Sequence, residues 1–161
     1  MIDRMAKKGS PRAFEFPRAM KDSPDFSFSG LKTSLLTMVK KRGGHFTQSQ
    51  LEDVVAGYQE AIVDVLVDKT VRAALEHQVA QVVVCGGVAA NSRLRERFTS
   101  ASADKNLELF IPPMILCTDN AAMIAALGEI MLKNGRSESL DLNAVSRWPL
   151  ATSSSCAFRG V

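Results

Sequence analysis

The sequence lacks any apolar run long enough to span a bilayer, which excludes an ordinary transmembrane helix. Its amino terminus, residues 1–4, is charged almost at once and has no secretory apolar core. These absences predict a cytosolic protein. Apolar residues nevertheless make up 46% of the 161 residues and charged residues 23%, proportions typical of a folded domain rather than a disordered chain.

Cysteine and histidine are both scarce. Cys85, Cys117 and Cys156 are odd in number, widely spaced and without a C-x-x-C pair, so we expect reduced thiols rather than a disulfide framework or a zinc site. The two histidines, His45 and His77, lie in no suggestive motif, and a catalytic serine would need one of them as its base. Hydrolase chemistry is therefore excluded for this chain.

The excess of positive charge is small. Lys and Arg number 20 and Asp and Glu 17, so the net charge is 20 − 17 = +3, which is compatible with an RNA partner without demonstrating one. The basic clusters could contact phosphates or form solvated faces: Lys7 with Lys8, Lys40 with Lys41 and Arg42, and Arg93 with Arg95 and Arg97. Helical alternation favours a solvated face for the arginines.

Hydrophobic spacing and turn residues predict a strand–helix–strand–helix order with short links, which indicates an α/β layer. The expected helices cover 2–8, 31–41, 47–77, 91–98 and 118–133, the expected strands 81–85 and 107–111, and residues 10–30 are expected to be extended or looped. The β-branched run 81–85 has the composition of a buried, parallel strand.

The longest expected helix begins with a capping box. The Thr47 hydroxyl can accept from an orphan amide while Gln50 reaches back to the start of the helix. One apolar stripe then follows at helical spacing: Leu51, Val54, Val55, Tyr58, Ile62, Val65, Leu66 and Lys69.

A glycine pair follows the first expected strand. Gly86 and Gly87 let backbone approach a ligand without a Cβ in the way, and the next helix offers unpaired N–H groups to an anion. Asn91 could contact a polar ligand through its amide. It could equally be a plain helix cap after a tight turn, and the pattern leaves the two readings about even.

Two further segments allow both a structural and a functional interpretation. Asp119 could be a metal ligand at the carboxyl end of a strand, but the helix dipole and capping explain an acidic residue there well. In the segment 25–33, Ser27 or Ser29 could cap the next helix. Phe26 and Phe28 are expected to anchor this loop in the core, since the phenylalanines have apolar neighbours and are expected in the core rather than as stacking platforms.

Taken together, four stretches in this order resemble the TsaD family, also called Gcp or O-sialoglycoprotein endopeptidase. They are IDRMA at 2–6, FSFSGLKT at 26–33, GGVAAN at 86–91 and CTDNAAMI at 117–124, and SRWPL at 146–150 is similar to bacterial members. The resemblance covers roughly residues 1–150. It implies part of an actin-like ATPase fold of the ASKHA, ribonuclease H-like class, an α/β fold. Residues 1–136 would be mainly its carboxyl-terminal lobe and 137–161 a polar tail.

The resemblance also implies an activity and its site. Members transfer threonylcarbamoyl from threonylcarbamoyl-adenylate to N6 of adenosine 37 in tRNAs that read codons beginning with A, and bacterial relatives work with TsaB-type and TsaE-type partner proteins. The residue matching Asp119 ligates a divalent metal, iron or zinc, which would polarise the donor's oxygens while the adenine amine attacks the carbamoyl carbon. Residues matching Asp3 and Asn91, with Gly86 and Gly87, would contact the nucleotide, Asp3 suiting ribose hydroxyls.

The departures from the family are large. Members have a further lobe with a His-x-x-x-His metal pair, whereas His45 and His77 lie 32 positions apart (77 − 45), and the Gly-Gly-Pro that precedes the Ile-Asp stretch is missing. We therefore expect a truncated chain that is inactive alone, with a weak or absent metal site. Two alternatives stay open: a shortened nucleotide-binding or assembly module without catalysis, and a misfolding remnant with exposed apolar surface.

Overall fold

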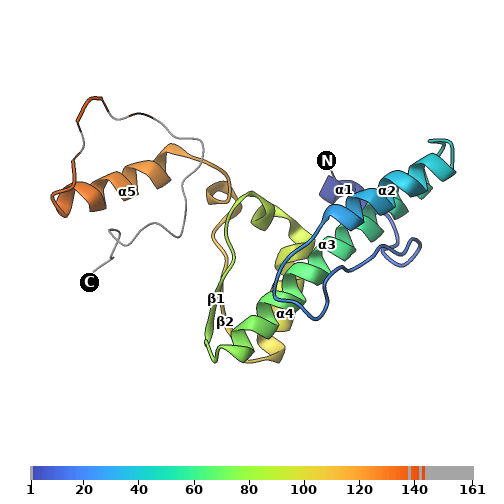
Figure 1. Cartoon of the computed structure of the whole chain (residues 1–161), viewed down its shortest axis with the longest axis horizontal. Coiled ribbons are helices and arrows are strands. Elements are labelled where there is room, and N and C mark those ends of the chain that lie inside the picture. Colours follow the sequence, from blue (N-terminus) through green and yellow to red (C-terminus); the bar gives the residue numbers. More distant parts are fainter. Residues whose placement is uncertain (1, 138, 142, 144–161) are drawn as a thin grey trace. The chain divides into compact units, whose positions relative to one another are not determined.

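A computed structural model describes residues 2–137, 139–141 and 143 of the protein (Figure 1). Contacts divide the chain into two units, Met1–Asp119 and Asn120–Val161, each of which is described by itself. The predicted boundary between a domain over 1–136 and a tail over 137–161 stays a prediction, because most of that tail lies outside the described residues. In the described part of the chain, no helix combines the length and apolar character needed to cross a membrane.

The first unit is built around α3, Gln48–Glu76. The predicted capping box is confirmed: the Gln50 amide donates to the Thr47 hydroxyl at 3.2 Å, and the Thr47 amide donates to the Gln50 side chain at 3.1 Å. The helix ends at its C-cap, His77, as expected.

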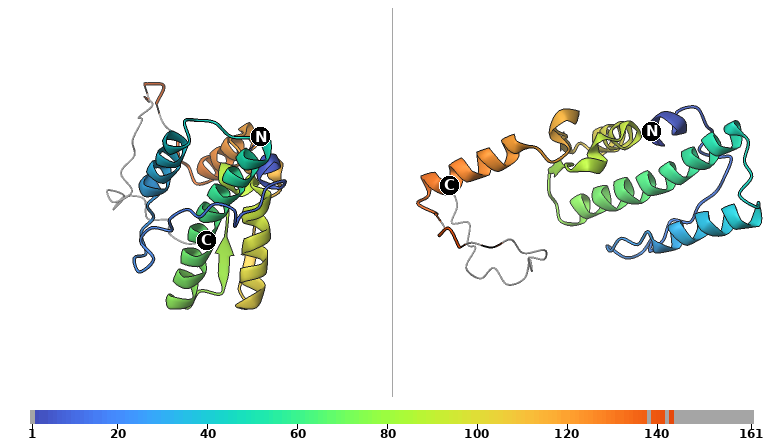
Figure 2. Two further views of the ribbon diagram at one scale, coloured as in Figure 1. Left: turned by 90° about the vertical axis from the view of Figure 1, so that its right-hand side faces the viewer. Right: turned by 90° about the horizontal axis from the view of Figure 1, so that it is seen from above.

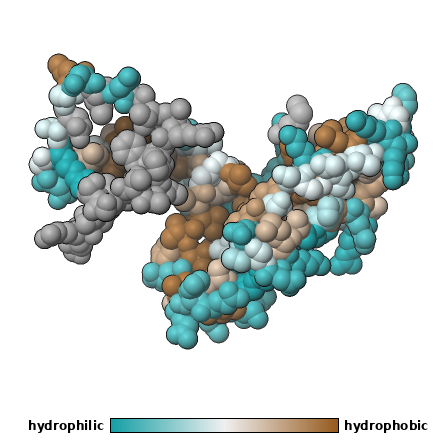
Figure 3. Space-filling model, viewed as in Figure 1, coloured by the Kyte–Doolittle hydropathy of each residue, from teal (hydrophilic) through white to brown (hydrophobic). Residues whose placement is uncertain are grey.

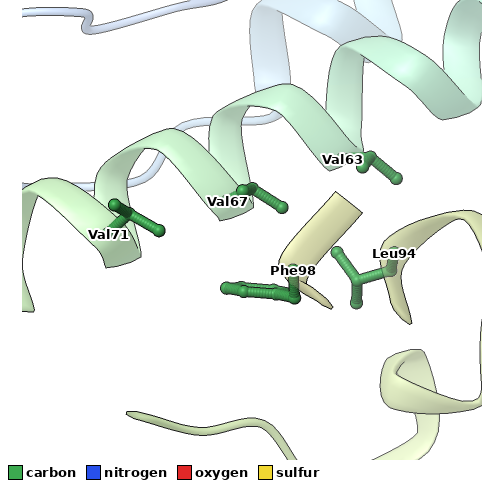
Figure 4. Close-up of a cluster of buried hydrophobic side chains, with 5 residues drawn as sticks. All are labelled: Val63, Val67, Val71, Leu94 and Phe98. Atoms are coloured by element: carbon green, nitrogen blue, oxygen red, sulfur yellow. The ribbon is translucent and has the colours of Figure 1, made fainter. Parts of the chain in front are cut away.

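Two apolar clusters pack on different sides of α3. Val63, Val67 and Val71 contact Leu94 and Phe98 of α4, Ser92–Asp104 (Figure 4). The second cluster joins α3 to α2, Ser29–Lys41, and consists of Phe16, Leu31, Val54 and Ala61; Figure 2 shows α2 running alongside α3. The prediction of one apolar stripe is therefore wrong, because neighbours on more than one side bury positions such as Ala61 and Val67 that the stripe omits.

The short helix α1, Ile2–Ala6, also packs against α3. Gly9 follows it and lies so close to α3 that an added Cβ would be 2.1 Å from the Glu52 carbonyl oxygen. Gly57, within α3, is equally confined: its added Cβ would be 2.5 Å from the Phe14 carbonyl oxygen. Both glycines are needed because backbone meets backbone at these points.

The α/β prediction is confirmed by a parallel pair of strands. The strand β1, Gln81–Val83, pairs with β2, Glu108–Phe110, and α4 connects them. The expectation of a fully buried strand is wrong for one face. Val82 faces the core and is 6% exposed, whereas Val83 is 68% exposed and its register partner Phe110 45%. Apolar surface accordingly gathers around the sheet (Figure 3), because no described residue of the first unit covers its second face.

The loop before α2 differs from its prediction. Phe26 and Phe28 are 49% and 37% exposed rather than anchored in the core, and their rings stack on each other with centroids 6.3 Å apart. Ser27 and Ser29 do not cap α2: its N-cap is Phe28, without a side-chain capping bond. The buried ammonium of Lys69 fixes the loop instead, because it donates to three of its backbone carbonyls, those of Met20, Ser23 and Asp25.

The second unit contributes α5, Ala121–Lys133, to the described residues. The Asn120 side chain caps it by accepting from the Met123 amide at 3.1 Å. Gly135 follows with φ +69°, in agreement with the predicted end of this helix. The SRWPL stretch at 146–150 and Cys156 lie outside the described residues.

Candidate nucleotide-binding site

The glycine pair after β1 forms an open turn. Gly86 has φ +88° and ψ 174°, a conformation that side-chain-bearing residues rarely adopt. Gly87 begins a short 3-10 helix, η1, Gly87–Ala90, which leads directly into α4. A Cβ added at Gly86 or Gly87 would meet nothing within 4 Å, so a ligand can approach this stretch of backbone.

Asn91 caps α4, which confirms the structural interpretation of this residue. Its side-chain oxygen accepts from the Leu94 amide at 2.9 Å, and its amide nitrogen donates to the buried Gln59 of α3 at 2.8 Å. These bonds fix the rotamer and leave one N–H and one oxygen lone pair. The capping role and a ligand contact are therefore compatible, and the ligand contact stays a prediction.

The carboxylate of Asp3 lies at the start of the same helix. Its Oδ1 accepts from the Ser92 hydroxyl at 2.9 Å, although the two residues are 89 positions apart in the sequence. Lys7, directly after α1, places its ammonium 3.9 Å from Oδ2. The structure thus brings Asp3 beside Asn91, two residues that the sequence singled out separately.

A cavity of about 260 Å³ opens beside Ser92, lined by residues that include Ala6, Lys7, Gln59, Glu60 and Arg93. Arg93 donates two 2.8 Å hydrogen bonds to the Glu60 carboxylate, which joins α4 to α3. These bonds lower the pKa of Glu60 below its ordinary value of 4.5, although burial opposes them in part. The cavity wall therefore keeps a fixed ion pair at neutral pH.

Arg95 links the glycine turn to the loop that carries Cys117. Its Nε donates to the Ala89 carbonyl at 2.6 Å, and its Nη2 donates to the Pro112 carbonyl at 2.6 Å and to the Cys117 sulfur at 3.0 Å. All three guanidinium groups bond to protein atoms, so the arginines do not form a fully solvated face, whereas their contact with phosphates stays a prediction. Arg97 pairs with Asp64 at 3.3 Å.

The position of Arg95 has a signal in the sequence. Arg93 and Arg97 are four positions apart, so they share one face of α4, whereas Arg95 lies two positions from each and points to the other side. That side faces the carboxyl ends of both strands, where ligands bind in open α/β sheets.

Asp119 lies directly after the loop held by Arg95. Its expected role in a helix cap or first turn is wrong, because Asn120 caps α5 and no acidic residue lies in that first turn. Asp119 is exposed, and no hydrogen bond or ion pair joins it to another described residue. The structure thus brings the loops of Asn91 and Asp119 together through Arg95 without a direct contact between these two side chains.

Metal binding requires more than Asp119. Among residues 2–137, 139–141 and 143, no group of three His, Cys, Asp or Glu side chains could hold a metal ion. Cys117 is buried and Cys85 exposed, both as free thiols, which agrees with the predicted reduced state for these two. The described side chains do not make up a metal site by themselves.

The fold and the site define an α/β protein whose glycine turn, helix N-terminus and carboxylate lie together after a parallel strand. Comparison with known proteins identifies it further. The family profile "TsaD: tRNA N6-adenosine threonylcarbamoyltransferase" matches residues 1–126, and the chain belongs to this family. The described α/β elements are accordingly part of its actin-like fold, as predicted.

Three relatives are named tRNA N6-adenosine threonylcarbamoyltransferase. The protein of Syntrophus aciditrophicus is 63% identical over 150 residues, which is 93% of this chain and 44% of the relative. That of Anaeromyxobacter dehalogenans is 51% identical over 152 residues, 92% of this chain and 45% of the relative. That of Syntrophotalea carbinolica is 46% identical over 152 residues, which is 93% of this chain and 44% of the relative. The chain therefore spans less than half the length of these curated relatives.

Proposed function

We propose that this chain supplies the nucleotide-binding face of a threonylcarbamoyl transferase that modifies tRNA. The observation that carries the proposal is the 2.9 Å contact between Asp3 and Ser92, which holds a carboxylate at the N-terminus of α4 next to Asn91. The donor would be threonylcarbamoyl-adenylate and the acceptor N6 of adenosine 37 in tRNA. The cytosolic location expected from the sequence remains a prediction.

Each part of this face suits one part of an adenylate. The Asp3 carboxylate can accept from ribose hydroxyls, while the open backbone at Gly86 and Gly87 and the first amides of α4 can approach a phosphate. Asn91, fixed by Gln59, keeps one donor and one acceptor for the same ligand. Arg95 holds this turn and the loop before Asp119 at a constant separation.

Asp119 is the residue of this chain that we assign to a divalent metal, iron or zinc. Its exposed carboxylate has no partner among the described residues, which suits an oxygen ligand. One carboxylate does not bind such an ion, so the other ligands would come from outside the described residues. We derive no catalytic step through the metal from this chain alone.

Reconstitution tests the proposal. The chain is assayed for threonylcarbamoyladenosine in tRNA, alone and with the amino-terminal portion of the Syntrophus aciditrophicus relative, with TsaB-type and TsaE-type proteins present in both. We expect product only in the combined sample. Asp3→Asn should lower the rate about tenfold to a hundredfold, since it weakens a charged hydrogen bond to the ligand.

Asp104→Asn is the matched control, because Asp104 is exposed at the far end of α4 and the charge change is the same. Product from the chain alone would disprove its dependence on a second part. Equal rates for the Asp3 and Asp104 variants would disprove the nucleotide role of Asp3. Nucleotide binding without product in the combined sample would favour the alternative of a non-catalytic binding module.

A further inference from the structure

The stretch from residue 26 to residue 51, which contains α2, forms a basic surface. No Asp or Glu occurs from residue 26 to residue 51, while Lys32, Lys40, Lys41 and Arg42 all fall in this stretch. The three lysines are exposed, and none forms an ion pair with a described residue. Figure 3 shows hydrophilic surface at the carboxyl end of α2. Such a surface attracts a polyanion.

An exposed aromatic pair lies at the other end of α2. The rings of Phe26 and Phe28 are nearly parallel, 14° apart, and both are exposed by more than a third. The ammonium of Lys69 lies 5.6 Å from the Phe26 ring centre and is bonded to the carbonyl of Asp25, so the pair is held in place before any partner arrives. Exposed rings that are held in position in this way suit the stacking of nucleobases.

A groove runs along one side of α2, from Gly30 to Arg42. Its volume is about 560 Å³, and it is lined by Gly30, Thr33, Ser34, Thr37, Met38, Lys41 and Arg42. The Ser34 and Thr37 hydroxyl groups can donate to phosphate oxygens, as can the ammonium group of Lys41, whereas the Thr33 hydroxyl already donates to the Ser29 carbonyl at 3.1 Å. The helix, 13 residues long, spans about 20 Å, so bases at the aromatic pair and phosphates at the lysines would belong to one extended strand.

We propose that Phe26, Phe28 and the exposed side of α2 bind single-stranded RNA, with bases stacked on the rings and phosphates along the hydroxyls and lysines. The inference rests on the proposed function, whose acceptor is an RNA, and identifies the surface that receives it. An acidic protein could also pair with the lysines, but acidic side chains would not stack on the parallel rings. RNA uses all three features together.

The test is fluorescence anisotropy of a labelled hairpin RNA with an unpaired loop, titrated with the purified chain at several salt concentrations. Phe26→Leu/Phe28→Leu keeps apolar area but removes the rings and should weaken binding about tenfold, whereas Phe26→Tyr/Phe28→Tyr should bind like the unaltered chain. Lys40→Ala/Lys41→Ala should weaken binding and reduce the logarithmic salt slope by about 1.4. Lys105→Ala/Lys133→Ala, with the same loss of charge elsewhere, should keep the slope.

Several results would overturn the inference. These are no RNA binding by the unaltered chain, equal affinity of the Leu and Tyr variants, or equal salt slopes for the two lysine variants. Equal binding of a fully paired RNA would also contradict it, because stacking requires unpaired bases. The reconstituted transfer assay separates the two proposals: RNA binding without product counts against the proposed function, and product with unaffected RNA binding in all variants counts against this surface.

Discussion

At the scale of single residues, ion pairs across α3 and α4 hold the candidate site in shape. The pairs Arg93–Glu60 and Arg97–Asp64 both join these two helices, at 2.8 Å and 3.3 Å. Glu60 keeps 14% of its side-chain surface exposed, so its hydrogen bonds are partly shielded from water. Partly buried pairs with two hydrogen bonds contribute more than exposed pairs, whose net contribution is small.

Glu60→Gln should therefore lower the free energy of unfolding by about 2 kcal/mol at neutral pH. The pKa of Glu60 in the folded chain is lowered from its ordinary value of 4.5. The contribution of Glu60 to the free energy of unfolding is therefore complete above pH 4.5 and is lost as the pH falls through the folded pKa. The difference between variant and unaltered chain should thus shrink in acid, as measured by urea unfolding across that range. Glu96→Gln is the control, since Glu96 bonds the same arginine but is 68% exposed. A Glu60 effect that does not change with pH would contradict this account.

The backbone contact at Gly57 gives a second prediction. Gly57→Ala would place a methyl group 2.5 Å from the Phe14 carbonyl oxygen, so the loop that contains Phe14 would have to move away from α3. We expect this change to lower the free energy of unfolding by about 2 kcal/mol or more. Gly30→Ala, in α2 with nothing within 4 Å, should leave stability unchanged or raise it slightly. Thermal unfolding of both variants measures this. Equal midpoints would show that the loop moves away freely.

Several single-residue roles were accessible from the sequence and others were not. The Thr47 capping box and the Asn91 cap depend on residues three positions apart, so local pattern suffices to predict them. The Asp3–Ser92 contact joins positions 89 apart, and no local pattern contains it. The exposure of Phe26 and Phe28 was missed for a related reason, because burial of a loop depends on what packs over it.

At the scale of elements, Arg95 determines how the two loops at the carboxyl edge of the sheet are spaced. Arg95→Lys should lose at least one of its bonds to Ala89, Pro112 and Cys117, because an ammonium group cannot match the fork of the guanidinium. We expect faster amide exchange both in 86–91 and in 113–118, and faster alkylation of the buried Cys117.

Arg97→Lys is the control for this change, since Arg97 pairs with Asp64 and touches neither loop. Mass spectrometry measures the rates of amide exchange and of cysteine alkylation, with the exposed Cys85 as an internal standard for alkylation. If the two arginine variants expose Cys117 equally, Arg95 does not hold the loops.

Local sequence signals predicted most helices and strands, but they did not predict which neighbours pack against each of them. The start of α3, the two strands and the end of α5 lie where caps, β-branched runs and glycines predict them. The single apolar stripe failed because α3 has neighbours on more than one side, and α4 extends to Asp104, beyond its expected end at 98. Periodicity reports one contact face well and a surrounded helix poorly.

At the scale of the whole molecule, the chain carries one recognisable part of a larger family fold. Its second sheet face, with Val83 and Phe110, is apolar and exposed, whereas parallel sheets are ordinarily covered on both faces. The chain matches 44% of the Syntrophus aciditrophicus relative. The motifs identified the family because four of them occur in order, but composition and charge alone identified neither family nor function.

The central claim is that Asp3, the glycine turn and Asn91 form one nucleotide-binding face. Backbone NMR of the labelled chain during titration with AMP tests it most directly. We predict saturable shifts confined to Asp3, Gly86, Gly87 and the first turn of α4, and their loss in Asp3→Asn but not in Asp104→Asn. Saturable shifts elsewhere, or none at these residues in a folded sample, would contradict the account.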